Sequence, residues 1–290
     1  MFLPRRILED RLLRILAEDL GQGDVTTALI VPSETTAEAV VIAKSPGVVA
    51  GIEETRILLE SLGLRTETLV QEGEKIKAGQ RLLRIFGDAK TMLSSERTVL
   101  NILSRMSGIA TITRNLAEKL QKARLQAKVA CTRKTAPGLM YFDKKAVQTG
   151  GGDTHRLHLD DMVLIKDNHI AFAGNIEKAV KKAREKVSFS KKIEVETTNV
   201  EDALKAAKAG ANIIMLDNFS PQQARKACKL LQKAGFRKSI LIEASGGINA
   251  ENIVQYASAG VDIVSLGEIT QSPKALDISM EITRINKKQS

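Results

Sequence analysis

The sequence predicts an α/β protein in two parts: a β-rich amino-terminal part, then an irregular, truncated β/α barrel of about seven strands. Glycine turns separate several β-type apolar runs between residues 37 and 85. From Lys128 onward, short apolar runs alternate with helical patterns, which indicates parallel strands joined by right-handed crossovers. With 290 residues, 43% of them hydrophobic, the chain is long enough to bury a core in each part.

In the amino-terminal part, apolar residues recur at helical spacing over 7–20, and this helix ends at Gly21. Strands are expected at 37–43, 47–51, 66–70 and 80–85. Helices are expected at 53–62 and 94–120. We interpret the β-rich stretch as a structural sandwich.

The barrel part contains seven short apolar runs that are typical of buried strands. They lie at 129–131, 146–149, 162–165, 193–196, 213–216, 240–244 and 262–266. Helices are expected at 175–187, 200–209, 221–234 and 250–259, with Asn199 and Ser220-Pro221 as start signals. An eight-unit barrel takes about 250 residues, more than this region offers, so a truncated barrel is favoured and an open doubly wound sheet is the alternative.

The strands of the barrel part have one aliphatic face and one face that becomes polar at the carboxyl end. Side chains alternate between faces along a strand, so Glu194 and Glu196 share a face, as do Met215 and Asp217. The opposite face carries aliphatic residues: Ile193, Val195, Ile214, Leu216, Ile240, Ile242, Val264 and Leu266. This is the pattern of a barrel whose outer wall packs on helices and whose carboxyl-end mouth does chemistry.

The predicted mouth has a cationic half and an acidic, glycine-rich half. The first contains Arg133, Lys134, His155, Arg156 and Lys166, and the second contains Glu196, Asp217, Ser245, Gly246, Gly247 and Gly267. Backbone N–H groups of the Ser245-Gly246-Gly247 turn, with a helix expected near Asn249, suit a phosphate. Arginine suits bidentate binding of carboxylate or phosphate. Glu196 and Asp217 suit Mg²⁺ or ribose hydroxyls; alternatively they only pair with Lys166 or Arg133.

The amino-acid composition limits which kinds of molecule this protein can be expected to bind. A formal charge of +10 favours acidic partners, either nucleic acid or a phosphate-bearing metabolite. An aromatic content of 3% and the lack of any nucleic-acid-binding motif argue against nucleic acid. Cys131 and Cys228 suggest no disulfide framework, which is consistent with the cytoplasm. No stretch is typical of a signal peptide or a membrane span, so we expect a soluble protein.

Together these residues resemble quinolinate phosphoribosyltransferase, a family of NAD synthesis. The resemblance rests on an ordered set of motifs: Glu18-Asp19, Gly23-Asp24-Val25-Thr26-Thr27, Glu96-Arg97-Thr98, Ser107-Gly108-Ile109-Ala110-Thr111, Thr132-Arg133-Lys134-Thr135, Pro137-Gly138, Gly150-Gly151-Gly152, His155-Arg156, Leu164-Ile165-Lys166-Asp167-Asn168-His169, Glu194-Val195-Glu196, Leu216-Asp217-Asn218 and Ser245-Gly246-Gly247-Ile248. They span almost the whole chain and are highly specific as a set.

The resemblance implies the fold, the reaction and the roles of the residues. It implies an α/β sandwich domain over 1–110, joined by a carboxyl-terminal helix at 273–290, and an irregular seven-stranded barrel over 111–272. The reaction would transfer phosphoribosyl from phosphoribosyl pyrophosphate to quinolinate with loss of CO₂, in the presence of Mg²⁺. Quinolinate would be surrounded by Arg97, Arg133, Lys134, His155, Arg156 and Lys166. Phosphoribosyl pyrophosphate would be served by Lys166, Glu196, Asp217, Ser245, Gly246, Gly247 and Gly267.

Four of these residues would be catalytic, and the enzyme would be a homo-oligomer. Lys134, Lys166, Glu196 and Asp217 would act on the reacting groups, with Glu196 and Asp217 also holding the metal directly or through water. A dimer or hexamer is implied, in which Arg97 completes a neighbour's site.

Four positions depart from the family pattern, where Asp, Arg, Asn and Gly are usual: Cys131, Met140, Thr154 and His158. The run from Ala130 to Thr135 also resembles a paralogue associated with molybdenum-transport operons, which would use a different acceptor. That paralogue lacks the Lys-Asp-Asn-His run found here at 166–169, so the quinolinate enzyme is favoured.

Overall fold

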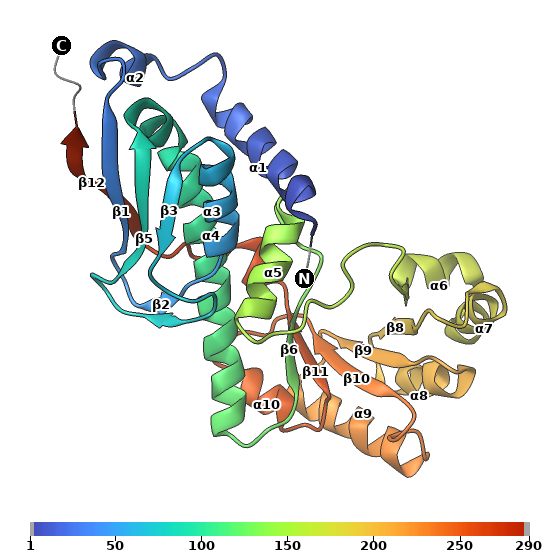
Figure 1. The fold of residues 1–290 in the computed structure, drawn as a ribbon. Helices are drawn as coiled ribbons and strands as arrows, with labels where there is room; N and C mark the ends of the chain where they lie inside the picture. Colours follow the sequence, from blue (N-terminus) through green and yellow to red (C-terminus); the bar gives the residue numbers. More distant parts are fainter. Residues whose placement is uncertain (1–2, 287–290) are drawn as a thin grey trace. The chain divides into compact units, whose positions relative to one another are not determined.

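The protein is represented by a computed structural model that describes residues 3–286 (Figure 1). The chain divides into two compact units. The first contains Met1–Ile112, Tyr141–Gly150 and Pro273–Ser290, and the second contains Thr113–Met140 and Gly151–Ser272. The predicted domains differ from this division in the segment 141–150, which groups with the first unit although we assigned it to the barrel.

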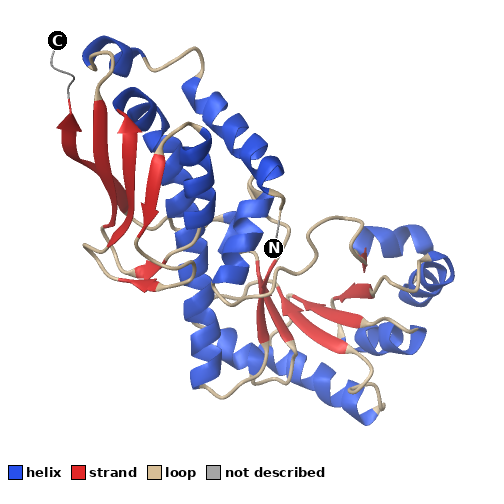
Figure 2. Ribbon diagram, in the orientation of Figure 1, coloured by secondary structure: helices blue, strands red, loops and turns tan. Residues whose placement is uncertain are grey.

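The first unit is built on an antiparallel sheet with the strand order β12-β1-β5-β3 (Figure 2). These strands are β1 (Thr36–Ala43), β3 (Arg65–Thr68), β5 (Arg81–Asp88) and β12 (Ile278–Asn286). The short strands β2 (Gly47–Val48) and β4 (Lys75–Ile76) form a second ladder. The β-rich stretch predicted between residues 37 and 85 is therefore confirmed.

The prediction of a helix at 273–290 is wrong for the described residues. Residues 278–286 form β12, which pairs with β1 from Ile278↔Ala43 to Asn286↔Thr36. Ile282, Thr283 and Ile285 are β-branched, and long-range pairing with β1 outweighs local helix preference. The last part of the predicted helix, 287–290, lies outside the described residues.

Helices complete the first unit. They are α1 (Arg5–Leu20), α2 (Val25–Ile30), α3 (Ile52–Ser61), α4 (Ala89–Lys122) and α5 (Met140–Thr149), and the unit boundary falls within α4.

The prediction of a strand at 146–149 is wrong, because these residues belong to α5. Every residue from Tyr141 to Val147 is buried, so this helix is enclosed on all sides. A four-residue apolar run alone does not distinguish a strand from a buried helix turn.

The second unit contains a six-stranded parallel sheet with the order β6-β11-β10-β9-β8-β7. The strands are β6 (Lys128–Cys131), β7 (Val163–Ile165), β8 (Ile193–Thr197), β9 (Ile213–Asp217), β10 (Leu241–Ser245) and β11 (Ile263–Leu266). The helices are α6 (Asp167–Ala173), α7 (Ile176–Lys186), α8 (Val200–Ala209), α9 (Pro221–Lys233), α10 (Ile253–Ala257) and α11 (Glu268–Gln271). An isolated bridge between Ala130 and Asp153 extends the sheet beyond β6. The unit is a barrel-like β/α domain, as predicted.

Local start signals explain most of the helix boundaries in this unit. Asn199 accepts from the N–H of Asp202 and caps α8, and Ser220 forms a capping box with Gln223 at α9. The helix expected from residue 250 begins later, at Ile253, because Asn249 accepts hydrogen bonds from Glu251 and Asn252 in a preceding turn. None of the helices in residues 3–286 combines the length and apolar composition that crossing a bilayer requires.

Candidate active site

A cavity of about 850 Å³ lies at the carboxyl ends of the parallel strands. Every site residue predicted within the barrel lines it: Arg133, Lys134, His155, Arg156, Lys166, Glu196, Asp217, Ser245, Gly246, Gly247 and Gly267. Arg97, the remaining predicted residue, lies exposed on α4 in the first unit. The cationic and acidic halves inferred from the sequence thus meet in one cavity.

Strand register explains why these side chains converge. Ser245 is paired with Asp217 on one side and with Ser265 on the other, so the three residues form a row across β9, β10 and β11. Leu164, Glu196, Met215 and Glu243 line the same cavity. The aliphatic residues of the other face are buried, as the alternation predicted.

Lys166 and Glu196 form an ion pair across the neighbouring strands β7 and β8. The Lys166 Nζ lies 2.7 Å from the Glu196 Oε2, and the lysine side chain is 46% exposed. Lys166 also precedes α6, and its backbone N–H donates to the His169 Nδ1. The pairing that we considered as an alternative to a functional role is therefore present, but in a solvent-accessible cavity where a ligand can exchange with either partner.

Asp217 is held by Asn218, a residue that the sequence argument did not single out as a site residue. The Asn218 amide donates to the Asp217 Oδ2 at 2.8 Å, and burial, with Glu196 second, raises the pKa of Asp217. Asn218 adopts a left-handed backbone conformation, with φ of 54°, and its N–H donates to the Ser245 carbonyl. A Cβ atom at Gly246 would lie 2.9 Å from the Asn218 N, so glycine is required there.

The glycine-rich side also accommodates Lys134. A Cβ atom at Gly267 would lie 3.1 Å from the Lys134 Cδ, so the glycine leaves room for the lysine stem. Thr270 donates to the Lys134 carbonyl and fixes this loop. The helix contribution expected near Asn249 is smaller than predicted, because α10 begins only at Ile253.

The cationic half concentrates positive charge. Burial, followed by repulsion from Arg133, lowers the pKa of Arg156. An anion between the two guanidinium groups relieves this repulsion, and a planar carboxylate matches their geometry. This half of the cavity is therefore suited to a ligand with more than one negative charge.

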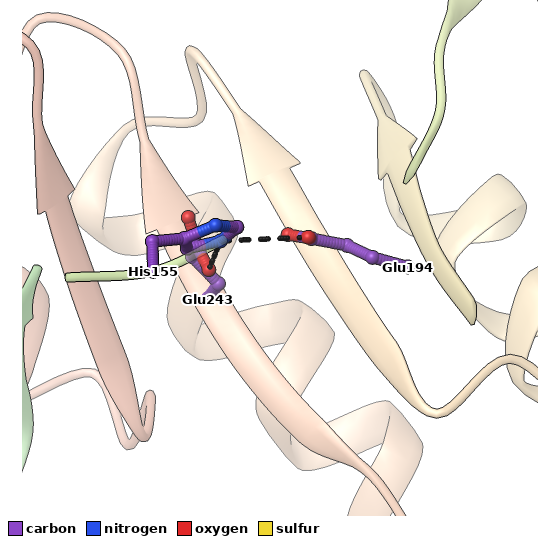
Figure 3. A group of neighbouring side chains, drawn as sticks. All are labelled: His155, Glu194 and Glu243. Atoms are coloured by element: carbon purple, nitrogen blue, oxygen red, sulfur yellow. Dashed lines mark hydrogen bonds and ion pairs between the residues drawn. The ribbon is translucent and has the colours of Figure 1, made fainter. Parts of the chain in front are cut away.

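Beneath the cavity, His155 contacts two fully buried glutamates, as Figure 3 shows. Its Nε2 lies 3.1 Å from the Glu243 Oε2 and 3.4 Å from the Glu194 Oε2, and its Nδ1 accepts the N–H of Arg156 at 2.8 Å. Sequence alternation placed Glu194 on the same face as Glu196, but nothing in it indicated that Glu194 shares a histidine with Glu243.

The protons of this cluster are shared among three groups. Burial lowers the pKa of His155, but the nearby carboxylates of Glu194 and Glu243 outweigh burial and raise this pKa, so the cluster as a whole retains an extra proton. The backbone N–H of Arg156 opposes a second proton on the ring, because a proton on Nδ1 would point at that N–H. The ring protonated at Nε2 alone satisfies all three contacts. Burial also raises the pKa of Glu194, so a carboxyl group can carry the cluster's second proton.

A second cavity of about 840 Å³ lies at the amino ends of the strands. It shares His155 and Arg156 with the first cavity and includes the Arg237–Asp262 ion pair. In β/α barrels the chemistry occurs at the carboxyl ends, where the other predicted residues gather. We therefore take the first cavity as the candidate active site.

The fold is that of a barrel-type β/α enzyme, and the charged halves of its cavity suit anionic ligands. The family model described as quinolinate phosphoribosyl transferase, N-terminal domain, matches residues 24–107, and the corresponding C-terminal domain model matches residues 109–281. The chain belongs to the quinolinate phosphoribosyltransferase family.

Individual relatives agree over nearly the full length. A probable carboxylating nicotinate-nucleotide pyrophosphorylase of Methanothermobacter thermautotrophicus is 43% identical over 94% of this chain and 98% of its own. The carboxylating nicotinate-nucleotide pyrophosphorylase of Homo sapiens is 38% identical over 88% of this chain and 85% of its own. The crystal structure of NadC from Streptococcus pyogenes superposes with a TM-score of 0.89, at 36% identity and 99% coverage of both chains.

Proposed function

We propose that this enzyme, a pentosyltransferase, converts quinolinate and phosphoribosyl pyrophosphate into nicotinate mononucleotide, pyrophosphate and CO₂ in NAD synthesis. The observation that carries this proposal is the single cavity in which a cationic half faces an acidic, glycine-rich half. Two anionic substrates need such a division, because each must be bound without repelling the other. The carboxylating names of the relatives favour quinolinate over the acceptor of the paralogous transferase.

The cationic half would bind the acceptor. Arg133 and Arg156 suit the two ring carboxylates, with Lys134 and Lys166 nearby in the same cavity. The quinolinate ring nitrogen would then attack the anomeric carbon of the ribose while the bond to pyrophosphate breaks. The positive pyridinium ring formed in this way stabilises the electron pair left at C2 when CO₂ departs, and a proton takes its place.

The acidic half would serve the ribose and the leaving group. Asp217 and Glu196 carry negative charge close to where the ribose develops positive charge, and Lys134 and Lys166 can offset charge on pyrophosphate. The Ser245-Gly246-Gly247 turn offers backbone N–H groups to a phosphate.

Mg²⁺ is part of the proposal, and the residues present fit it. Burial raises the pKa of Asp217, and repulsion from Glu196 raises it further; a bound cation relieves such repulsion. Carboxylate oxygens are the ligands that Mg²⁺ prefers, directly or through water. When bound, the ion would neutralise charge on pyrophosphate.

We further propose that the enzyme is a cytoplasmic homo-oligomer, a dimer or a hexamer, in which Arg97 reaches a neighbour's site. Support comes from the exposure of Arg97 on α4 and from its place in the Glu96-Arg97-Thr98 motif. We propose no role for nucleic acid or a membrane.

A coupled assay tests the proposed reaction. The protein is incubated with quinolinate, phosphoribosyl pyrophosphate and Mg²⁺, and mononucleotide and CO₂ are measured together. Equal amounts of both products are expected, and chelation of the metal should stop their formation. Absence of both products would rule out quinolinate as the acceptor. Turnover of another pyridine acid without CO₂ release would point to the paralogous activity.

A further inference from the structure

Both ring nitrogens of His155 are already engaged within the protein. Figure 3 shows the ring directed at the carboxylates of Glu194 and Glu243, which come from β8 and β10 and are fully buried. The other nitrogen, Nδ1, accepts the backbone N–H of the next residue, Arg156. Although His155 lines the cavity, neither nitrogen is left to bind a ligand there without breaking one of these contacts.

The hydrogen-bond pattern also argues against a metal ion in this cluster. A histidine and two carboxylates are common metal ligands, and their ligand atoms lie within 4.8 Å of one another. Binding through Nε2 requires that nitrogen to be unprotonated, and the proton would then sit on Nδ1. Nδ1 faces an N–H donor at 2.8 Å, so this arrangement places two protons against each other.

The backbone around His155 is fixed at several further points. His155 has a φ of 53°, and its N–H donates to the Asp153 Oδ1 at 2.8 Å. Asp153 itself bonds to β6: its N–H donates to the Val129 carbonyl, and its carbonyl accepts the N–H of Cys131. The left-handed backbone holds the imidazole inward, and the next residue, Arg156, lines the cavity.

We propose that Glu194 and Glu243 are positioning residues for the acceptor half of the cavity, and that His155 contributes no ring nitrogen to the substrate. The two glutamates orient the imidazole of His155, and the imidazole accepts the backbone N–H of Arg156. The position of the Arg156 guanidinium beside Arg133 depends on these contacts. The inference rests on the proposed function, in which Arg133 and Arg156 bind the acceptor's carboxylates.

Two substitutions of Glu243 test this positioning role. Glu243→Leu removes the acceptor of the Nε2 proton, whereas Glu243→Gln retains an acceptor oxygen in a similar volume. Because a hydrogen bond to a charged group is involved, Glu243→Leu should raise the Kd of quinolinate about tenfold or more and leave the Kd of phosphoribosyl pyrophosphate within about twofold. Glu243→Gln should bind quinolinate within about threefold of the unmodified protein. Glu201→Gln, on the exposed side of α8, is the control and should change neither.

Equal weakening of both substrates in Glu243→Leu, or no weakening at all, would overturn the inference. If the assay of the unmodified protein yields no mononucleotide, it is the proposed function that fails. If that assay succeeds while the substrate split is missing, only the positioning role fails.

A measurement on the unmodified protein does not depend on the folding of any variant. The chain has three histidines, so ¹⁵N labelling of histidine gives a simple NMR spectrum, and His155→Gln identifies the signal of interest. We expect a ring protonated only at Nε2, and this pattern should persist at saturating quinolinate. A ring nitrogen that changes its proton when quinolinate binds would show direct ligation and would refute the proposal.

Discussion

Two fully buried carboxylates, one in each unit, are compensated in opposite ways. In the first unit, Asp143 accepts from Arg105 through both oxygens, at 2.7 and 2.9 Å. In the second unit, neither oxygen of Glu194 has a hydrogen bond within the described residues, and its Oε2 lies 3.4 Å from the His155 Nε2. Glu243, also buried, approaches the same nitrogen.

The difference separates a structural charge from a functional one. Both oxygens of Asp143 accept from one arginine of the same unit, so this pair stabilises the first unit without need of a ligand. Glu243 lines the cavity and Glu194 interacts electrostatically with Arg156, so their partly compensated negative charge can influence how cations are held there. Proteins depart from full polar satisfaction mainly at such sites.

The largest expected effect comes from breaking the satisfied pair. Arg105→Ala leaves Asp143 buried without its bidentate partner, and this should lower the free energy of unfolding by about 3–5 kcal/mol. Denaturant unfolding followed by circular dichroism measures it. The double variant Arg105→Met/Asp143→Leu should recover part of the loss, because neither charged member of the pair is left without the other. A loss below about 1 kcal/mol in Arg105→Ala would contradict this account of the first unit.

A substitution on the functional side should affect turnover rather than stability. Asp217→Asn keeps the size of the side chain but removes the negative charge near the ribose, so kcat should fall about 100-fold or more. The free energy of unfolding should change by less than about 1 kcal/mol, because surface-accessible polar changes are mild. Steady-state kinetics with saturating substrates measure the first quantity, and Asp160→Asn, outside the cavity, is the control. Unchanged kcat would remove Asp217 from the site.

A smaller, selective effect is expected at the cationic half. Arg133→Ala should raise the Kd of quinolinate about 10- to 100-fold, because one arginine–carboxylate interaction is lost. Binding of phosphoribosyl pyrophosphate should weaken much less. Titration calorimetry with each substrate separates the two effects. Equal losses for both ligands would show that the halves of the cavity are not divided as proposed.

The sequence predicted the convergence of the site better than its internal contacts. Asp217 and Ser245 were placed correctly because alternation along a strand and parallel pairing are local rules. The Glu194–His155–Glu243 cluster was missed, because β8 and β10 are separated by β9, and their approach depends on how the sheet curves. The helix α5 and the strand β12 were misassigned for a related reason: burial and pairing with distant strands overrode short local patterns.

A buried ionisable group can also remain neutral. Cys228 on α9 is such a group, and we expect the smallest effect here. Burial raises the pKa of this thiol to about 11, so the reactive thiolate stays rare until the pH approaches that value. Iodoacetamide at pH 8 should therefore leave Cys228 unmodified in the folded protein and alkylate it after denaturation. Peptide mass mapping distinguishes it from Cys131, which is also buried. Rapid alkylation of Cys228 in the folded state would show that α9 opens readily and that burial alone does not keep this group neutral.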